Sequence, residues 1–403
     1  MEKLQLDIGN VIIMTTDIEE KALSQLHCLV EQPAFRNAKV RIMPDVHAGA
    51  GCVIGFTADL GTKVIPNIVG VDIGCGMHVV ELGKTNLDLE AVDRFIKQNI
   101  PSGFAVNNKV QAPFDLNKLY CYNELINVDR LALGIGSLGG GNHFIELDKD
   151  ENDNTYLVIH TGSRNLGKQV ACIYQDKAIN YCRNLAKPEI DKTIKDLKAQ
   201  GRQMELQQAI KNINEKYKEY SVPKELCYLE GDLRNAYLHD MKLCQEYAIL
   251  NRKIISDKIV KYLSEKFGVK KQAEWESIHN YIDDSNMVRK GAIAAHKGQE
   301  VIIPLNMRDG SIIGVGKGNA DWNESGPHGA GRLLSRGEAK RVLNVVDFKK
   351  SMEGIYSTTV DNSTLDEAPM AYKPADEIID AVNDTVDIKC IIKPIYNFKA
   401  AED

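Results

Sequence analysis

The sequence predicts an α+β fold in a single large domain, with a β-rich core and an inserted helical segment. Strand-like stretches occur towards both ends of the chain, a long stretch with helical periodicity lies between them, and no linker, internal repeat or low-complexity segment divides the 403 residues. We therefore expect one domain over residues 1–403, with residues 166–262 as a helical insertion within it.

The first strand-rich stretch covers residues 40–82, where short apolar runs are broken by glycine and proline. This pattern is typical of strands joined by tight turns. Helices are expected at residues 87–99 and around 116–127. A glycine-rich run then opens a strand at His143, and the apolar residues 157–159 predict another strand that ends at His160.

The middle and the end of the chain differ in their periodicity. Residues 190–220 indicate a solvated helix or helical hairpin, and residues 232–263 an amphipathic helix. Because the charges of this insertion are mixed in sign, we interpret it as packing support rather than as an arm that contacts nucleic acid. Strands resume after Trp275, followed by a helix at about 332–344 and a strand at 387–398.

Composition excludes several classes of protein. With 50 Lys+Arg against 56 Asp+Glu, the net charge of -6 argues against a protein that binds nucleic acid through overall basicity. No apolar run approaches the roughly 20 residues of a transmembrane helix, and the start of the chain does not resemble a signal peptide, so we expect a cytoplasmic protein without a membrane partner. Nine cysteines without a C-x-x-C pair predict neither a disulfide framework nor a zinc finger, but mostly small buried thiols.

Five histidines lie beside glycine or asparagine at expected strand ends: His47, His143, His160, His279 and His328. One such histidine alone is more often structural. Asp72 and Cys75 lie three residues apart across a glycine-containing turn, where a turn cap and a core thiol are the plainer interpretation. Together with the histidines, however, they form a metal-ligand inventory, and ligand softness favours zinc, cobalt or iron.

His328 lies in a different setting, the run SGPHGAGRLLSR. A helix expected to begin near Gly331 would offer free N–H groups to an anion. Between Arg289 and Arg341, nine Lys+Arg face five Asp+Glu. The imidazole could be a nucleophile, a general acid or base, or a contact only, and a solvated basic helix face is the alternative. The chain has no G-x-x-x-x-G-K-[ST], H-E-x-x-H, G-x-S-x-G or K-x-D-G motif, and the run GIGSLGGGN precedes a strand, which argues against a dinucleotide loop.

Eight motifs, in their order and spacing, resemble the RtcB family of RNA-splicing ligases over nearly the whole chain. They are DVHAGAG, GVDIGCG, GGGNHFIE, HTGSRNLG, HN at 279–280, RKGA at 289–292, HGAGR and DEAPMAYK. The resemblance implies the family's own α+β fold with a central metal cleft. It also implies GTP- and Mn²⁺-dependent joining of an RNA 3'-phosphate or 2',3'-cyclic phosphate end to a 5'-hydroxyl end, in RNA repair or tRNA splicing.

The resemblance also implies roles for individual residues. Cys75 would bridge two Mn²⁺ ions. The resemblance thus implies manganese, whereas ligand softness alone favours zinc, cobalt or iron. Asp72 and His143 would complete one ion's ligands, and His160 and His279 the other's. His328 would attack GTP and carry GMP, Arg164 would hold RNA phosphate, and Asp45 would support it. The implied nucleotide-binding residues are Asn142, Glu146, Pro304, Asn306, Met307, Gly329, Ala330, Gly331, Tyr372 (packed on guanine) and Lys399.

The chain departs from the family pattern in two places. Pro304-Leu305-Asn306-Met307 stands where the family has Pro-Gly-Ser-Met, and Gly326-Pro327 precedes His328 where the family has cysteine or serine. The chain therefore resembles a short, divergent member, in which Asn306 would replace the hydrogen bond of the missing serine. Two alternatives remain open: a metal-dependent cyclic phosphodiesterase and a non-catalytic RNA-end binder. We expect a monomer, and the need for an accessory protein is left open.

Overall fold

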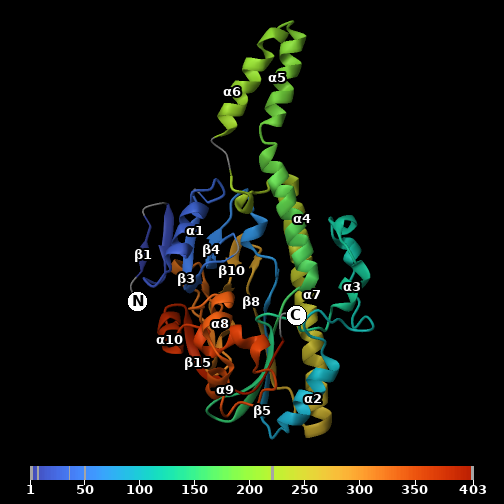
Figure 1. The fold of residues 1–403 in the computed structure, drawn as a ribbon, viewed down its shortest axis with the longest axis vertical. Coiled ribbons are helices and arrows are strands. Elements are labelled where there is room, and N and C mark those ends of the chain that lie inside the picture. Colours follow the sequence, from blue (N-terminus) through green and yellow to red (C-terminus); the bar gives the residue numbers. More distant parts are fainter. Residues whose placement is uncertain (1–2, 7–8, 36, 50, 219–221, 401–403) are drawn as a thin grey trace.

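The computed structural model describes residues 3–6, 9–35, 37–49, 51–218 and 222–400. It confirms the predicted α+β class, with three sheets and a set of helices that covers them (Figure 1). The six-stranded sheet has the order β1-β2-β3-β4-β10-β9 and is antiparallel except for the parallel pair β2–β3. Its strands are β1 (Leu4–Gln5), β2 (Asn10–Ile13), β3 (Lys39–His47), β4 (Ile54–Asp59), β10 (Met287–Lys290) and β9 (Tyr281–Ile282).

The seven-stranded sheet is antiparallel throughout, in the order β12-β13-β15-β6-β7-β5-β8. Its outer strands β12 and β8 contact each other, and the Ile302 N–H donates to Ser277 Oγ at 3.1 Å, so the sheet curls on itself. A two-stranded sheet pairs β11 (Ala292–Ala294) with β14 (Ser325–Pro327). The seven strands are β12 (Glu300–Asn306), β13 (Gly310–Gly316), β15 (Val386–Lys399), β6 (Phe144–Lys149), β7 (Asn154–Thr161), β5 (Gly76–Lys84) and β8 (Ala273–Ile278).

The stretch between β7 and β8 is helical. Its helices are α4 (Arg164–Arg183), α5 (Lys187–Ala199), α6 (Leu206–Lys218) and α7 (Gly231–Phe267). The long helix α7 packs on β5 and β7 and places Ile255, Ile259 and Leu263 in the core, with α4 alongside it. Figure 1 shows α5 and α6 as a hairpin that projects away from the body, so this part of the insertion does not support the core by packing.

The remaining helices are α1 (Glu20–Val30), α2 (Leu89–Asn99), α3 (Val128–Leu133), α8 (Arg336–Val342), α9 (Val345–Ser351) and α10 (Ala375–Val382). The prediction of a helix at 87–99 is confirmed by α2, whose N-cap Asp88 accepts a hydrogen bond from the Ala91 N–H. The prediction around 116–127 is wrong, because only two short 3₁₀ turns form there. The buried Asp240 carboxylate accepts the Tyr120 and Cys121 N–H groups, which a continuous helix would need for itself.

The predicted helix at 332–344 is also only partly right, since α8 begins at Arg336, where the Ser335 side chain caps it. Gly331 has φ +75, and a Cβ there would come within 2.7 Å of the Asp45 carbonyl oxygen. This close approach requires glycine in a left-handed conformation and prevents a helix from starting at this point. His328 therefore directly follows strand β14, and α8 begins eight residues later, at Arg336.

All nine cysteines are free thiols, of which Cys28 and Cys172 are exposed, so the expectation of buried thiols holds for most but not all of them. Among the helices of the described residues, none is both long enough and apolar enough to cross a bilayer.

Candidate active site

Four potential metal ligands lie at one edge of the seven-stranded sheet. Cys75 directly precedes β5, His143 precedes β6, His160 lies near the end of β7, and His279 follows β8. Gly76 pairs with Thr161 on one side and with Ile278 on the other, and Phe144 pairs with His160. Antiparallel neighbours thus bring two strand starts and two strand ends to the same edge.

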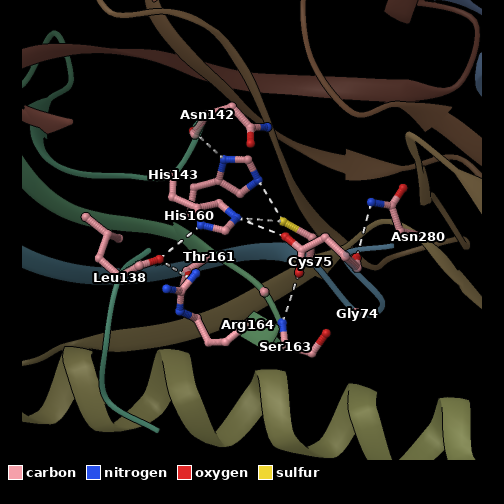
Figure 2. Close-up of polar contacts among 12 residues, drawn as sticks. Gly74, Cys75, Leu138, Asn142, His143, His160, Thr161, Ser163, Arg164 and Asn280 are labelled. Carbon is pink, nitrogen blue, oxygen red and sulfur yellow. Dashed lines mark hydrogen bonds and ion pairs between the residues drawn. The ribbon is translucent and has the colours of Figure 1, made fainter. Parts of the chain in front are cut away.

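The donor atoms of this edge converge, together with Asp72. Cys75 Sγ lies 3.3 Å from His160 Nε2 and 3.6 Å from His143 Nε2. His143 Nε2 lies 2.9 Å from Asp72 Oδ2, and His160 Nε2 lies 3.3 Å from His279 Nε2. Two groups that can hold a cation result, Asp72–Cys75–His143 and Cys75–His160–His279, and they share the cysteine. Figure 2 shows His143, His160 and Cys75 pointing towards one another.

Backbone carbonyl groups fix the orientation of two of these rings. His143 Nδ1 donates to the Leu138 carbonyl at 3.0 Å, and His160 Nδ1 donates to the Asn142 carbonyl at 3.1 Å. Because a carbonyl only accepts, Nδ1 carries the proton in both rings and Nε2 presents a lone pair to Cys75. In metal sites, one ring nitrogen of a histidine binds the ion through its lone pair, and the other donates to a carbonyl or carboxylate that orients the ring. His143 and His160 have this arrangement in a buried site, so the residues fit a bound cation.

Burial favours the neutral form of these side chains. It lowers the pKa of His160 and of His279 well below the ordinary value, with the neighbouring histidines acting in the same direction. Burial and the nearby Asp72 carboxylate raise the pKa of Cys75 well above that of a free thiol. A bound cation would reverse the last effect, because it stabilises the thiolate.

Contacts with Gly162, Ser163 and Arg252 fix the turn that carries Asp72. The Ser163 N–H donates to Asp72 Oδ1 at 3.1 Å, and a Cβ on Gly162 would lie 2.1 Å from the same oxygen, so the carboxylate rests directly on that glycine. The fully buried Arg252 donates to the carbonyls of Gly74 and Thr161 at 2.9 and 2.8 Å. Sequence reasoning missed Arg252, although a cation on the inward side of an amphipathic helix was a signal for it.

His328 approaches this cluster from the two-stranded sheet. Its ring centroid lies 5.0 Å from that of His279. His328 Nδ1 donates to Asp45 Oδ2 at 2.7 Å, and the His328 N–H donates to the same oxygen at 3.1 Å. Asp45 is fully buried in β3, so its carboxylate positions His328 and does not lie with Arg164. The bond to Asp45 places the proton on Nδ1 and leaves a lone pair on Nε2.

A cavity of about 280 Å³ joins the cluster to His328. It brings together Asp72, Cys75, His160, His279 and His328 with all of the predicted nucleotide-binding residues: Asn142, Glu146, Pro304, Asn306, Met307, Gly329, Ala330, Gly331, Tyr372 and Lys399.

The far end of this cavity holds a buried charge network around Glu367. The carboxylate accepts from Tyr372 at 2.6 Å, lies 2.8 Å from Lys399 Nζ and lies 3.1 Å from Arg332. Burial alone would raise the pKa of Glu367, but Lys399, Arg332 and Arg336 outweigh it and lower the pKa to about 2. Sequence reasoning named the motif DEAPMAYK but missed the role of its glutamate.

Glu146 is a second buried carboxylate in the cavity. Its side chain accepts from Asn397, and burial raises its pKa to about 7 although Lys399 and Asn397 act in the opposite direction. Burial and the charge of Glu146 raise the pKa of Asp148, which lies behind it on β6, well above the ordinary value. Glu146 can therefore change its charge near neutral pH.

Asn306, which replaces the serine of the family pattern, forms hydrogen bonds within its own turn. Its Oδ1 accepts the N–H groups of Arg308 and Asp309, both at 3.0 Å, and its Nδ2 donates to the Asp309 carboxylate at 2.7 Å. Both lone pairs of Oδ1 are used within this turn, whereas Nδ2 has a second N–H, so Asn306 lines the cavity as a donor and not as a further acceptor.

The basic stretch from Arg289 to Arg341 is only partly at the site. Arg332 and Arg336 line the cavity. Arg289, in contrast, is buried against Asp283 at 2.6 Å, and Arg308 pairs with Asp309. The local excess of charge therefore overstates the positive charge that faces a ligand.

Arg164 lies outside the cavity, in a neighbouring groove that reaches Asp72 and His143. Its guanidinium donates to the Gly103 carbonyl at 3.0 Å and to Ser137 Oγ at 3.3 Å. The structure thus separates Arg164 from Asp45 and places it at the opposite end of the cluster from His328.

Comparison with known proteins gives one family. The model of the family described as "tRNA-splicing ligase RtcB" matches residues 25–130 and 124–400. The chain is 28% identical to the RNA-splicing ligase RtcB1 of Escherichia coli strain ATCC 25922 and to the RNA-splicing ligase RtcB of strain K12, over 95% of each chain in both cases. It is also 28% identical to the tRNA-splicing ligase RtcB of Nanoarchaeum equitans, over 84% of this chain and 83% of that protein.

Proposed function

The chain belongs to the RtcB family, and from this premise we propose that it is a GTP-dependent RNA ligase. It would join an RNA 3'-phosphate or 2',3'-cyclic phosphate end to a 5'-hydroxyl end. The observation that carries the proposal is the position of His328, whose Nε2 is left unprotonated by Asp45 in the same cavity as four of the five converging metal-capable side chains, Asp72, Cys75, His160 and His279.

In the first step His328 acts as the nucleophile. Nε2 attacks the α-phosphorus of GTP, a P–N bond forms, the bond to the β-phosphate oxygen breaks, and pyrophosphate leaves with the electron pair. The imidazole acquires positive charge in this step, and the Asp45 carboxylate at 2.7 Å from Nδ1 stabilises it.

The cofactor we propose is manganese, two ions per chain. One would be held by Asp72, Cys75 and His143, the other by Cys75, His160 and His279. When bound, such cations supply positive charge that stabilises phosphate oxygens and lowers the pKa of an attacking hydroxyl or water.

In the RNA steps, a cyclic phosphate is first opened by water to a 3'-phosphate. An oxygen of that phosphate attacks the phosphorus of the GMP on His328, the P–N bond breaks, and GMP is transferred to the RNA end. The 5'-hydroxyl then attacks the RNA phosphorus, a phosphodiester forms, GMP leaves with the electron pair, and the hydroxyl proton passes to water.

The charged end of the cavity would hold the guanine. Tyr372 provides an aromatic surface, Glu146 can accept hydrogen bonds from the base, and Lys399 can donate one. These groups come from β6, β15 and the segment between α9 and α10, and all three line the cavity.

The test is a ligation assay with two short RNAs, one ending in a 3'-phosphate and one beginning with a 5'-hydroxyl. We expect joining that requires both GTP and Mn²⁺, with no joining of a 3'-hydroxyl to a 5'-phosphate end. Joining without GTP would contradict the proposal. Opening of a cyclic phosphate without any joining would favour the cyclic phosphodiesterase instead.

A further inference from the structure

A groove of about 630 Å³ adjoins the metal-capable cluster at Asp72 and His143. Its exposed apolar side chains are Val71, Phe104 and Ile126, which are 52%, 76% and 66% exposed. Three apolar side chains at one groove form a patch, unlike the isolated exposed residues that are normal on protein surfaces.

The charged residues of this groove are almost all positive. Among its described lining residues, the cations are Arg130, Arg164 and Lys168, and the one carboxylate is Asp72, which lies 2.9 Å from His143 Nε2 and belongs to the metal-capable cluster. In a protein with a net charge of -6, this groove therefore presents a positive wall beside an aromatic ring. Cations beside an exposed aromatic side chain are the arrangement that binds single-stranded nucleic acid.

The backbone around Phe104 is fixed by two of these cations. Arg164 donates to the Gly103 carbonyl at 3.0 Å, and Arg130 donates to the Phe104 carbonyl at 2.5 Å. The Gly103 N–H also donates to the Gly139 carbonyl at 3.0 Å. The ring is thus held in an outward position by a pinned loop, which lowers the entropy cost of stacking a base on it.

The order of the residues across the metal-capable cluster indicates which RNA end would bind in this groove. The contacts run from Asp72 to His143, Cys75, His160 and His279, and from there to His328. The groove opens at the Asp72 end, whereas GMP would be at the His328 end. In an in-line displacement the attacking oxygen lies opposite the leaving group, so the strand with the attacking 5'-hydroxyl enters from the end away from GMP.

We propose that this groove binds the single-stranded RNA that carries the 5'-hydroxyl, with a base stacked on Phe104 and phosphates held by Arg130, Arg164 and Lys168. The inference rests on the proposed function, because the direction of entry depends on GMP at His328. The positive wall argues for a nucleic acid rather than for a protein partner of the apolar patch.

The experiment measures binding of a short, 3'-labelled single-stranded RNA with a 5'-hydroxyl and a 3'-hydroxyl to the full chain by fluorescence anisotropy, without GTP. Phe104→Leu should weaken binding on the order of tenfold, and Phe104→Tyr should restore it. Lys168→Gln should lower the slope of log affinity against log salt by about 0.7. Because Phe104 and Lys168 are exposed, neither change disturbs the core.

Two matched controls lie outside the groove. Val346, on α9, is as exposed as Phe104, and Lys195, on α5, is exposed like Lys168. Val346→Ala and Lys195→Gln should bind the RNA as the unaltered chain does. Equal effects at the control positions would overturn the assignment of the groove.

Labelling of the chain with GMP, measured in the absence of RNA, separates the two proposals. If His328 takes GMP but Phe104→Leu and Lys168→Gln bind the RNA like the unaltered chain, the groove assignment is overturned and the proposed function stands. If no GMP is taken up, the proposed function fails, and the anisotropy still decides whether the groove binds RNA. RNA binding that is lost only in the groove variants supports the inference.

Discussion

The two ends of the cavity that His328 lines are built in different ways. At the metal-capable end, Cys75, His143, His160 and His279 all lie at the ends of neighbouring strands of one sheet. At the proposed nucleotide end, Glu146, Asn306 and Lys399 lie on β6, β12 and β15 of the same sheet, whereas His328 follows β14 of the two-stranded sheet and Glu367 lies between α9 and α10. The first end depends on the register of a single sheet, whereas the second also depends on how other parts of the chain pack against that sheet. The two ends should therefore respond differently to substitution.

The largest effect is expected from Cys75→Ala, because this side chain belongs to both donor groups. The variant should lose bound Mn²⁺ and label with GMP at least about a thousandfold more slowly, beyond the ~10–100-fold that loss of an outer partner costs. Metal content by mass spectrometry and the rate of labelling check it. The exposed Cys172→Ala serves as the control, and retention of both ions by Cys75→Ala would contradict the shared-ligand geometry.

At the nucleotide end, Glu367→Gln should mainly affect stability. It removes the carboxylate that Lys399 and Arg332 contact in the buried network, and breaking a buried ion pair costs about 3–5 kcal/mol. Urea unfolding measures the loss, with the partly exposed Glu338→Gln as the control. An unchanged unfolding midpoint would show that the network does not hold this end together.

Asp45→Asn should slow labelling without loss of metal, because Asp45 contacts His328 and none of the metal-capable residues. We expect a decrease of about 10–100-fold, as for other partners that orient a functional histidine. The comparison with Cys75→Ala sharpens the separation of the two ends. Loss of Mn²⁺ from Asp45→Asn would show that the ends are coupled.

The smallest expected effect is a pH dependence of GTP binding. Because the pKa of Glu146 is raised to about 7, the carboxylate is largely protonated at pH 6 and ionised at pH 8. If it accepts hydrogen bonds from guanine, GTP binding should tighten by about tenfold at most over this range. Calorimetry at several pH values measures this change. Glu146→Gln should bind more weakly and lose the pH dependence, and an equal dependence in that variant would exclude Glu146 as its source.

The difference between the two ends of the cavity also explains which features could be predicted from the sequence. Four of the metal-capable residues lie at strand ends and Asp72 lies in the turn before β5, so short local motifs were enough to name them as possible ligands. Their convergence depends on the antiparallel pairing of β5, β6, β7 and β8, which the motifs do not show. Asp45 could not be connected with His328 in this way, because 283 positions separate the two residues and only the packing of β14 against β3 joins them. The helix expected to begin near Gly331 failed for the same reason, since the close approach of the Asp45 backbone excludes it.

Tertiary contacts also explain two features that local sequence patterns did not predict: the missing helix at 116–127 and the role of Arg252. Asp240 removes the N–H groups that a helix at 116–127 would need, and Arg252 uses an inward position of α7 to hold the turn beside Cys75. Both residues lie on α7, more than 100 positions from the segments that they organise. Periodicity identifies such a helix and its inward side, but it does not show which distant segment a buried polar side chain contacts.

The most direct test of the central claim is labelling with α-³²P GTP and Mn²⁺, followed by peptide mapping. We expect an acid-labile GMP on the peptide that contains His328, absent in His328→Ala and retained in His296→Ala, whose histidine lies outside the cavity. His328→Ala should still bind Mn²⁺, because the donor cluster is intact. Undiminished labelling of His328→Ala, or GMP on another peptide, would contradict the assignment of the nucleophile.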